Sequence, residues 1–184
     1  SILPTSTNYS RNALFAGMMP AQIAQQYPEL WKFDEDESGK NLFEKELLVN
    51  LLKNCRLDYK IYYDKILNNK SGEKILENLS AILENQLAVI VYNFVDMISH
   101  SRTEMEMIRE LANDEKAYRS LTITWFEHSS LFELIKKLAA KNIKLVITTD
   151  HGTIRVGNPV KVVGERNTTT NLRYKQGKNL NYNP

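Results

Sequence analysis

The sequence predicts an α/β fold with a largely parallel central sheet flanked by helices, and three observations support it. Apolar runs of strand length, such as 87–94 and 143–149, alternate with longer amphipathic stretches. The runs are almost continuously apolar, which is typical of parallel strands that are covered on both faces. Each of these two runs also leads into polar side chains, as expected where strands reach the ligand-binding edge of an open α/β sheet.

The elements follow one another in the order that such a fold requires. Helical periodicity of apolar side chains predicts helices, and shorter runs of β-forming residues predict strands. An acidic run at 34–37 is predicted to lie in a solvent loop that is a candidate lid, and 68–72 is predicted to be a turn. The predicted helices cover 9–17, 21–26, 42–52, 73–85, 103–114 and 116–140, and the predicted strands cover 59–66, 87–94, 143–149 and 160–163.

Length and composition limit the classes of function. The 184 residues fit one domain or a piece of a larger one, and the net charge of only +2 gives no whole-chain attraction to nucleic acid or membranes. No apolar run is long enough to span a bilayer, so no membrane partner is expected. The sequence from Arg155 onward contains six Lys/Arg residues and one acidic residue, which indicates either a solvated tail or an anion-binding segment. The single cysteine, Cys55, excludes an internal disulfide and is expected to pack in the core.

A hydroxyl-rich segment, Thr5-Ser6-Thr7-Asn8, precedes the first predicted helix. Such side chains cap helices. A helix N-terminus also favours anions and can activate a nucleophile placed there. The segment is therefore either a plain helix cap or part of a catalytic site.

Two predicted strands each lead to an Asp and a His. Asp96 and His100 follow the strand at 87–94, and the adjacent pair Asp150-His151 follows the strand at 143–149. Carboxylate and imidazole suit Zn²⁺ or Mn²⁺, and two such ions can clamp a phosphoryl group during in-line displacement. A Thr hydroxyl next to them would be activated by coordination. The alternative is that the Asp residues cap turns and the His residues are incidental.

Three nearby residues have predicted supporting roles. Gly152 is expected to let the chain turn away after His151. Arg155 is a candidate for holding a phosphate oxygen through its planar guanidinium. His128 lies among aromatic residues and is expected to be a packed structural residue.

The order of these motifs resembles the alkaline phosphatase superfamily. Pro4-Thr5-Ser6-Thr7, followed by Gly17 and Pro20, is similar in spacing to the nucleophile segment of nucleotide pyrophosphatase/phosphodiesterases. The resemblance implies that Thr7 is the nucleophile and a metal ligand, with Thr5 as the open alternative. It implies that Asp96 and His100 bind one metal and that Asp150 and His151 bind the other. Asn8 and Arg155 are then candidates for substrate binding.

A closer resemblance rests on five segments. They are LPTSTNYSRNALFAG (3–17), NFVDMISHSR (93–102), WFEHS (125–129), TDHGTIRV (149–156) and NTTTNLRYKQGKNL (167–180). This resemblance is to the PglZ domain of PorX-type response regulators. It implies an alkaline-phosphatase-like fold and a zinc-dependent phosphodiesterase with two zinc ions, manganese being the alternative metal. The implied substrate is a cyclic or linear oligonucleotide or another phosphodiester. The implied setting is a cytoplasmic regulator of type IX secretion, with a phospho-receiver domain in the same chain and homodimerisation left open.

The sequence departs from this pattern at two ligands. The superfamily uses a further Asp on the strand before the nucleophile and a further His late in the chain, and neither has a match here. We therefore expect residues 1–184 to be a segment of a longer PglZ domain, without its first strand and C-terminal part. If those ligands are absent, metal binding should be weak. The alternative function is a catalytically weak module that senses nucleotide or zinc, or docks a partner.

Overall fold

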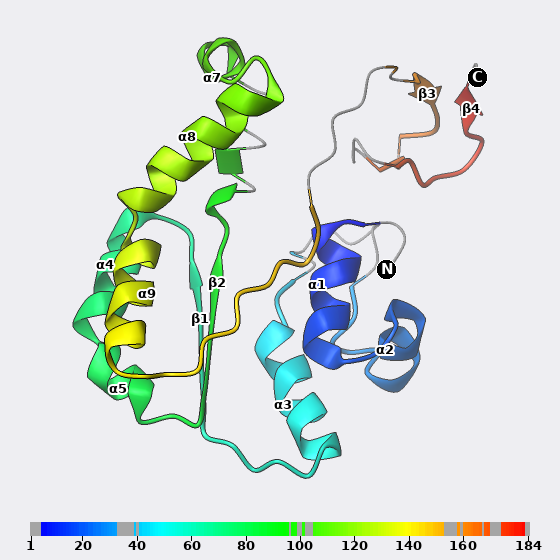
Figure 1. The fold of residues 1–184 in the computed structure, drawn as a ribbon. Helices are drawn as coiled ribbons and strands as arrows, with labels where there is room; N and C mark the ends of the chain where they lie inside the picture. The colour runs from blue at the N-terminus through cyan, green and yellow to red at the C-terminus, as the bar shows by residue number, and fades with distance from the viewer. Residues whose placement is uncertain are drawn as a thin grey trace. The chain divides into compact units, whose positions relative to one another are not determined.

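The chain folds into two compact units in the computed structural model. One unit comprises Ser1–Asp58 together with Thr148–Pro184, and the other comprises Tyr59–Ile147. Figure 1 shows the elements of both units. The residues that the structure describes are 5–32, 39, 41–95, 97–98, 101, 105–152, 158, 160–166, 168–169 and 174–182.

The first unit is built on three helices, α1 (Thr7–Ala16), α2 (Pro20–Gln26) and α3 (Glu44–Asn54). Helix α1 packs against both α2 and α3. The helix predictions for this part of the chain are confirmed with small shifts at their ends. The buried apolar side chains of these helices and of the segment after α2 are Ala13, Phe15, Ala16, Ile23, Trp31, Leu47, Leu48 and Leu52.

Helix α1 ends at a glycine that the packing requires. Gly17 has a φ of 64°, in the left-handed region, and its N–H donates to the carbonyl oxygen of Ala13. A Cβ atom at this position would lie 2.6 Å from Cδ1 of Leu51 in α3. Glycine therefore allows both the helix end and the close approach of α1 to α3.

A short hairpin lies in the C-terminal part of the first unit. Strand β3 (Val162–Val163) pairs antiparallel with β4 (Asn181–Tyr182). The strand predicted at 160–163 is confirmed in β3, whereas the sequence analysis did not predict β4.

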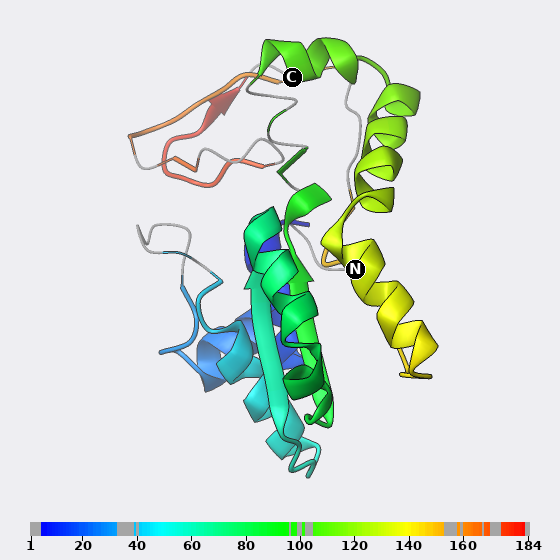
Figure 2. The ribbon, with the colours of Figure 1, turned by 90° about the vertical axis from the view of Figure 1, so that its left-hand side faces the viewer.

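The second unit contains a two-stranded parallel sheet. Strand β1 (Ile61–Ile66) pairs with β2 (Leu87–Tyr92) in a register that runs from Ile61 opposite Leu87 to Ile66 opposite Tyr92. The connection between the strands contains α4 (Asn69–Glu77) and α5 (Leu79–Leu83), as a parallel pair requires a crossover. Figure 2 shows these two helices beside the paired strands. The buried core of this unit is Ile66, Ile75, Leu79, Ile82, Leu134 and Leu138.

The described part of the second unit also contains α7 (Glu106–Leu111), α8 (Glu115–Glu127) and α9 (Ser130–Ala140). The helical region predicted over 116–140 is confirmed as two helices, because the helix is interrupted at Ser129. The Ser129 hydroxyl donates to the Phe126 carbonyl and accepts from the N–H of Phe132, so it closes α8 and caps α9. The helix predicted at 73–85 is likewise divided, between α4 and α5 at Asn78.

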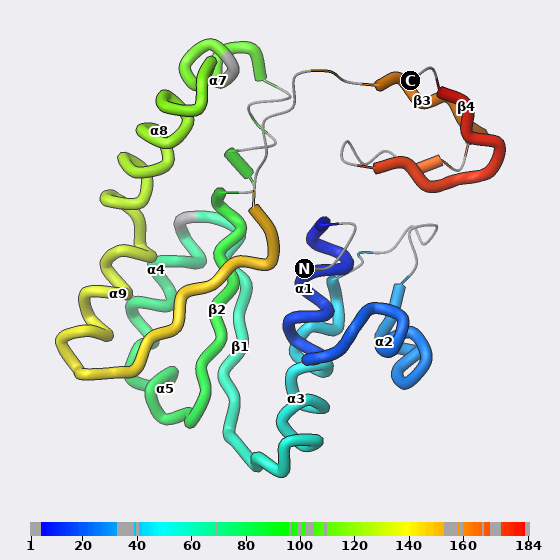
Figure 3. Tube along the Cα trace, turned by 45° about the vertical axis from the view of Figure 1, so that its right-hand side comes forward, coloured from blue at the N-terminus to red at the C-terminus, as the bar shows by residue number. Residues whose placement is uncertain are grey.

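The strand predicted at 143–149 is wrong. These residues have no regular secondary structure, and Val146 and Ile147 are 76% and 73% exposed. Figure 3 traces the segment as an irregular path. A strand needs a neighbour for its backbone hydrogen bonds, and in the described part of this unit the sheet consists of β1 and β2. The described residues therefore form a mixed α/β structure with helices and a small parallel sheet.

The structure also corrects the expectations for residues 68–72 and for Cys55. The turn predicted at 68–72 is the start of α4, where the Asn68 side chain accepts from the N–H of Ser71. Cys55 is exposed instead of packed in the core. The acidic run at 34–37 lies outside the described residues. No helix among the described residues is long and apolar enough to cross a membrane.

Candidate active site at the start of helix α1

The N-terminus of α1 carries the predicted nucleophile. Ser6 is the N-cap residue and Thr7 is the first residue of the helix. Arg11 follows Thr7 by four residues, so the two side chains lie one turn apart on the same face of α1. Within the described part of the chain, the buried hydroxyl oxygen of Ser6 has no hydrogen-bond partner. The helix start thus combines two hydroxyl groups with a guanidinium group one turn below.

Thr7 contacts His151 across most of the sequence. Thr7 Oγ1 lies 2.9 Å from His151 Nε2. The other ring nitrogen, Nδ1, lies 3.2 Å from the carbonyl oxygen of Gly152. A carbonyl oxygen only accepts, so this pattern assigns the proton to Nδ1. The Nε2 lone pair therefore points to the Thr7 hydroxyl, which donates.

Asp150 is held on both of its carboxylate oxygens. Oδ1 accepts from the backbone N–H of His151 at 3.1 Å, and Oδ2 accepts from Arg11 Nε, also at 3.1 Å. The same Oδ2 lies 3.9 Å from His151 Nε2. Only 15% of the Asp150 side chain is exposed, so these contacts act in a partly desolvated setting.

Backbone contacts fix the segment that bears Asp150 and His151. The hydroxyl of Thr149 donates to the carbonyl oxygen of His151 at 2.7 Å, which closes a tight turn. The prediction that the chain turns away after His151 concerns residues 153–157, which lie outside the described part of the chain, so it stays a prediction for Gly152. Its φ does not lie in the left-handed region, and a Cβ there would meet no described atom within 4 Å. The side chain of Thr149 therefore shapes the turn at 149–151.

Asn41 holds Thr7 from the other side. Its Nδ2 donates to the Thr7 carbonyl oxygen and to Oδ1 of Asn12, both at 3.2 Å. Asn12 is buried in α1 with 1% exposure. Asn41 thus links the backbone of the candidate nucleophile to the buried face of its helix.

A comparison with protein-family models matches residues 1–184 to the BREX system PglZ alkaline phosphatase-like domain. The chain belongs to the PglZ family. A search of the curated proteins found no significant match. The family match supports an alkaline-phosphatase-like domain and a phosphoesterase type of fold.

The side chains of this PglZ domain fit one metal ion in their chemistry. Thr7 Oγ1, His151 Nε2 and Asp150 Oδ2 are an alcohol, an imidazole and a carboxylate donor. Their separations of 2.9 Å and 3.9 Å are of the size expected between ligands that share one ion, given metal–ligand distances of about 2.0–2.2 Å. Among the described residues, no group of three or more His, Cys, Asp or Glu side chains is arranged so that it could hold a metal ion. The hydroxyl is thus needed to make up a three-ligand set.

The structure places some of the predicted site residues and not others. Thr7, Asp150 and His151 come together in the first unit. Asn8 is buried in the first turn of α1, with 8% exposure. The remaining predicted site residues lie outside the described part of the chain: Asp96, His100 and Arg155.

Sequence reasoning missed three polar residues at this site, namely Arg11, Glu44 and Asn41. Arg11 could have been found, because a charged residue four positions after Thr7 must share its helix face. Glu44 reads as an ordinary acidic residue in the first turn of α3. Outside the site, His128 is exposed and its Nδ1 lies 2.8 Å from the Thr124 carbonyl oxygen, so the expectation that it packs among aromatic residues is wrong.

Proposed function

We propose that this PglZ domain is a metal-dependent phosphodiesterase with Thr7 as its nucleophile. The observation that carries the proposal is the contact of 2.9 Å between Thr7 Oγ1 and His151 Nε2, with the Asp150 carboxylate beside it. The family match supports a phosphoesterase type of fold, and the buried Ser6 hydroxyl is a further polar group at the same helix end.

Each side chain has a defined part in the reaction. The Thr7 oxygen forms an ester bond to phosphorus while the bond to the leaving alcohol breaks, and water then hydrolyses this ester and restores Thr7. The α1 N-terminus favours the phosphate charge. His151 and Asp150 are the ligands for a metal, which when bound would lower the pKa of the Thr7 hydroxyl and stabilise negative charge.

The finer assignments rest on sequence resemblance and belong to the proposal. They are two zinc ions with manganese as the alternative, Asp96 and His100 as ligands of the second ion, and Asn8 and Arg155 as substrate contacts. An oligonucleotide or other phosphodiester is the proposed substrate, and homodimerisation stays open.

The proposed cellular setting follows from the same resemblance. It is the cytoplasmic output domain of a response regulator that acts in type IX secretion and carries a phospho-receiver domain in the same chain. The description of the matched family names the BREX system, which favours a second setting in such a system.

The alternative function is a signalling module that binds nucleotide or zinc, or docks a partner, with little turnover. It would use the same Asp150 and His151 but would not need the Thr7 hydroxyl to react. Metal or nucleotide binding without hydrolysis would favour this alternative.

Metal content and hydrolysis measured together test the proposal. The full-length protein is purified, its bound metal is determined by elemental analysis, and its hydrolysis of bis(p-nitrophenyl) phosphate is followed. Asp150→Ala should lose at least one bound ion and the activity, whereas Asp58→Ala, at an exposed aspartate of the same unit, should keep both. Equal metal content in the two variants would contradict the proposal.

A further inference from the structure

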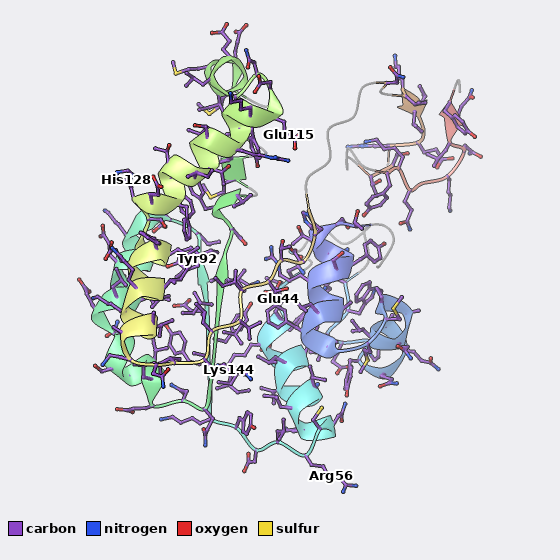
Figure 4. The ribbon with its side chains drawn as sticks, viewed as in Figure 1. Glu44, Arg56, Tyr92, Glu115, His128 and Lys144 are labelled. Atoms are coloured by element: carbon purple, nitrogen blue, oxygen red, sulfur yellow. The ribbon has the colours of Figure 1, made fainter. Side chains whose placement is uncertain are left out.

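Arg11 lies between two carboxylates that come from different segments. Its Nε donates to Asp150 Oδ2 at 3.1 Å, and its Nη1 lies 3.6 Å from Glu44 Oε1. All three side chains are shielded from solvent, with exposed fractions of 10% for Arg11, 15% for Asp150 and 0% for Glu44. Figure 4 labels Glu44 at the start of α3, beside α1.

A contribution to the stability of the fold does not by itself explain why these three charged side chains are buried together. Removing ions from water costs several kcal/mol per ion by order of magnitude, and well-packed apolar side chains often stabilise a fold equally well. The Glu44 side chain is fully shielded from water, and the Arg11 guanidinium 3.6 Å away offsets the charge of its carboxylate. If all three groups are charged, the two carboxylates and the guanidinium together carry one net negative charge. We place this charge at Asp150, next to His151.

We propose that Arg11 is a positioning residue that orients the Asp150 carboxylate toward a metal ion, and that Glu44 anchors Arg11 and offsets its charge. This inference rests on the proposed function, in which Asp150 is a metal ligand. Arg11 touches neither the candidate nucleophile nor the ring of His151 in the described contacts, so it acts through Asp150.

The geometry explains how the orientation is achieved. A carboxylate has about four lone-pair sites, and here one site on each oxygen is used, by the N–H of His151 and by Arg11 Nε. Two donors on different oxygens prevent rotation of the group and leave a lone pair on each oxygen for an ion. The planar guanidinium supplies two separate nitrogens for its two carboxylates, which a lysine ammonium cannot do in the same directions.

Because Glu44 offsets the charge of Arg11, the inference predicts the direction in which metal affinity changes when Arg11 is lost. A guanidinium beside a metal ligand would by itself repel the metal ion. With Glu44 Oε1 3.6 Å from Arg11 Nη1, the Arg11–Glu44 pair is close to neutral. Arg11 keeps its hydrogen bond to Asp150. We therefore expect loss of Arg11 to weaken metal binding, although it removes a positive charge.

Zinc affinity of the full-length protein tests the inference. The metal-free protein is titrated with Zn²⁺ in competition with a chromophoric chelator, and the absorption spectrum of the Co²⁺-loaded protein is recorded. Arg11→Gln should weaken zinc binding roughly 10- to 100-fold, as is usual for a residue that supports a ligand, and should alter the Co²⁺ spectrum. Arg11→Lys should restore only part of the affinity. Arg119→Gln, which removes an exposed Arg–Glu pair of α8, should leave both unchanged.

Circular dichroism and thermal unfolding without metal show whether each variant folds. Arg11→Gln removes the guanidinium beside the buried Glu44 carboxylate, so the double variant Arg11→Gln/Glu44→Gln removes both charges and keeps a similar shape. The double variant should also bind zinc more weakly than the unaltered protein. A folded variant would overturn the inference if its zinc affinity is unchanged or tighter, since tighter binding would mean that the guanidinium competes with the metal.

Asp150→Ala separates this inference from the proposed function. If Asp150→Ala abolishes zinc binding while the folded Arg11 variants keep it, the positioning role is overturned and the phosphodiesterase proposal survives. If Asp150→Ala binds zinc as the unaltered protein does, Asp150 is not a ligand, and both proposals fail.

Discussion

Thr7 Oγ1 and His151 Nε2 lie within 2.9 Å of each other although the residues are 144 positions apart. Thr7 begins helix α1, and His151 stands in a turn that has no regular secondary structure. The neighbours of this pair make contacts as well, because Arg11 donates to Asp150. One face of α1 thus contacts two consecutive residues of the distant segment, so the helix aligns the whole Asp-His pair.

Thr7→Val should abolish hydrolysis of a model phosphodiester, with a loss of roughly a thousandfold or more in kcat, because the reacting oxygen is removed. Thr7→Ser keeps the hydroxyl and should retain measurable activity. Thr5→Val decides between the two threonines. Loss of activity in Thr5→Val but not in Thr7→Val would assign the nucleophile to Thr5.

Asn41→Ala should lower the free energy of unfolding by about 1–2 kcal/mol, because the hydrogen bonds to the Thr7 carbonyl and to the Asn12 side chain are lost. Urea unfolding followed by circular dichroism measures the change. The matched control is Asn54→Ala, where an exposed amide donates to the Tyr27 hydroxyl at 3.3 Å. Equal losses in the two variants would show that Asn41 has no special part in holding α1.

Gly17→Ala should destabilise the first unit by about 1–3 kcal/mol, because a side chain would be held in the left-handed region. Its Cβ would also press on Leu51. Gly152→Ala should change stability by less than about 0.5 kcal/mol, since neither constraint applies there. Thermal unfolding of the two variants checks both expectations. A large loss at Gly152 would mean that the turn depends on glycine after all.

Stability at alkaline pH should fall as a consequence of Tyr62. Burial, together with a hydrogen bond to Asp64 and the charge of Asp64, raises the pKa of Tyr62 to about 12 from its ordinary value of 10.0. The unfolded chain therefore loses this proton first, and the stabilising effect is complete below pH 10 and is lost as the pH rises toward 12. Tyr62→Phe should show a shallower decline in the melting temperature over this interval. An unchanged slope would contradict the shifted pKa.

The sequence predicted those parts of the candidate site that a local sequence pattern marks. The segment Thr5-Ser6-Thr7-Asn8 stands out because capping side chains precede an amphipathic helix, whereas the choice of Thr7 within it came from the family resemblance. Asp150-His151 stands out because an adjacent Asp-His pair is unusual after an apolar run. Glu44 and Asn41 could not be predicted in this way. Their roles depend on α3 and the residues before it packing against α1, and no local pattern encodes such a contact.

The error at 143–149 has a different physical cause. Apolar β-forming residues indicate that a segment favours burial and extended backbone, but a strand exists only where a second strand supplies hydrogen-bond partners. Strands β1 and β2 meet that condition because a short helical crossover brings them together. Val146 and Ile147 have the same type of side chain without such a neighbour in the described sheet.

The division of the chain has a consequence for synthesis on the ribosome. The second unit is continuous in sequence, whereas the first unit needs residues from both sides of it. At typical rates of about 5–20 residues per second, the interval between making Thr7 and making His151 is on the order of ten seconds. During that interval α1 exists without the segment that contacts Thr7 and Arg11. A nascent chain stalled just after Ile147 therefore contains every residue of the second unit but lacks the residues that contact its candidate nucleophile.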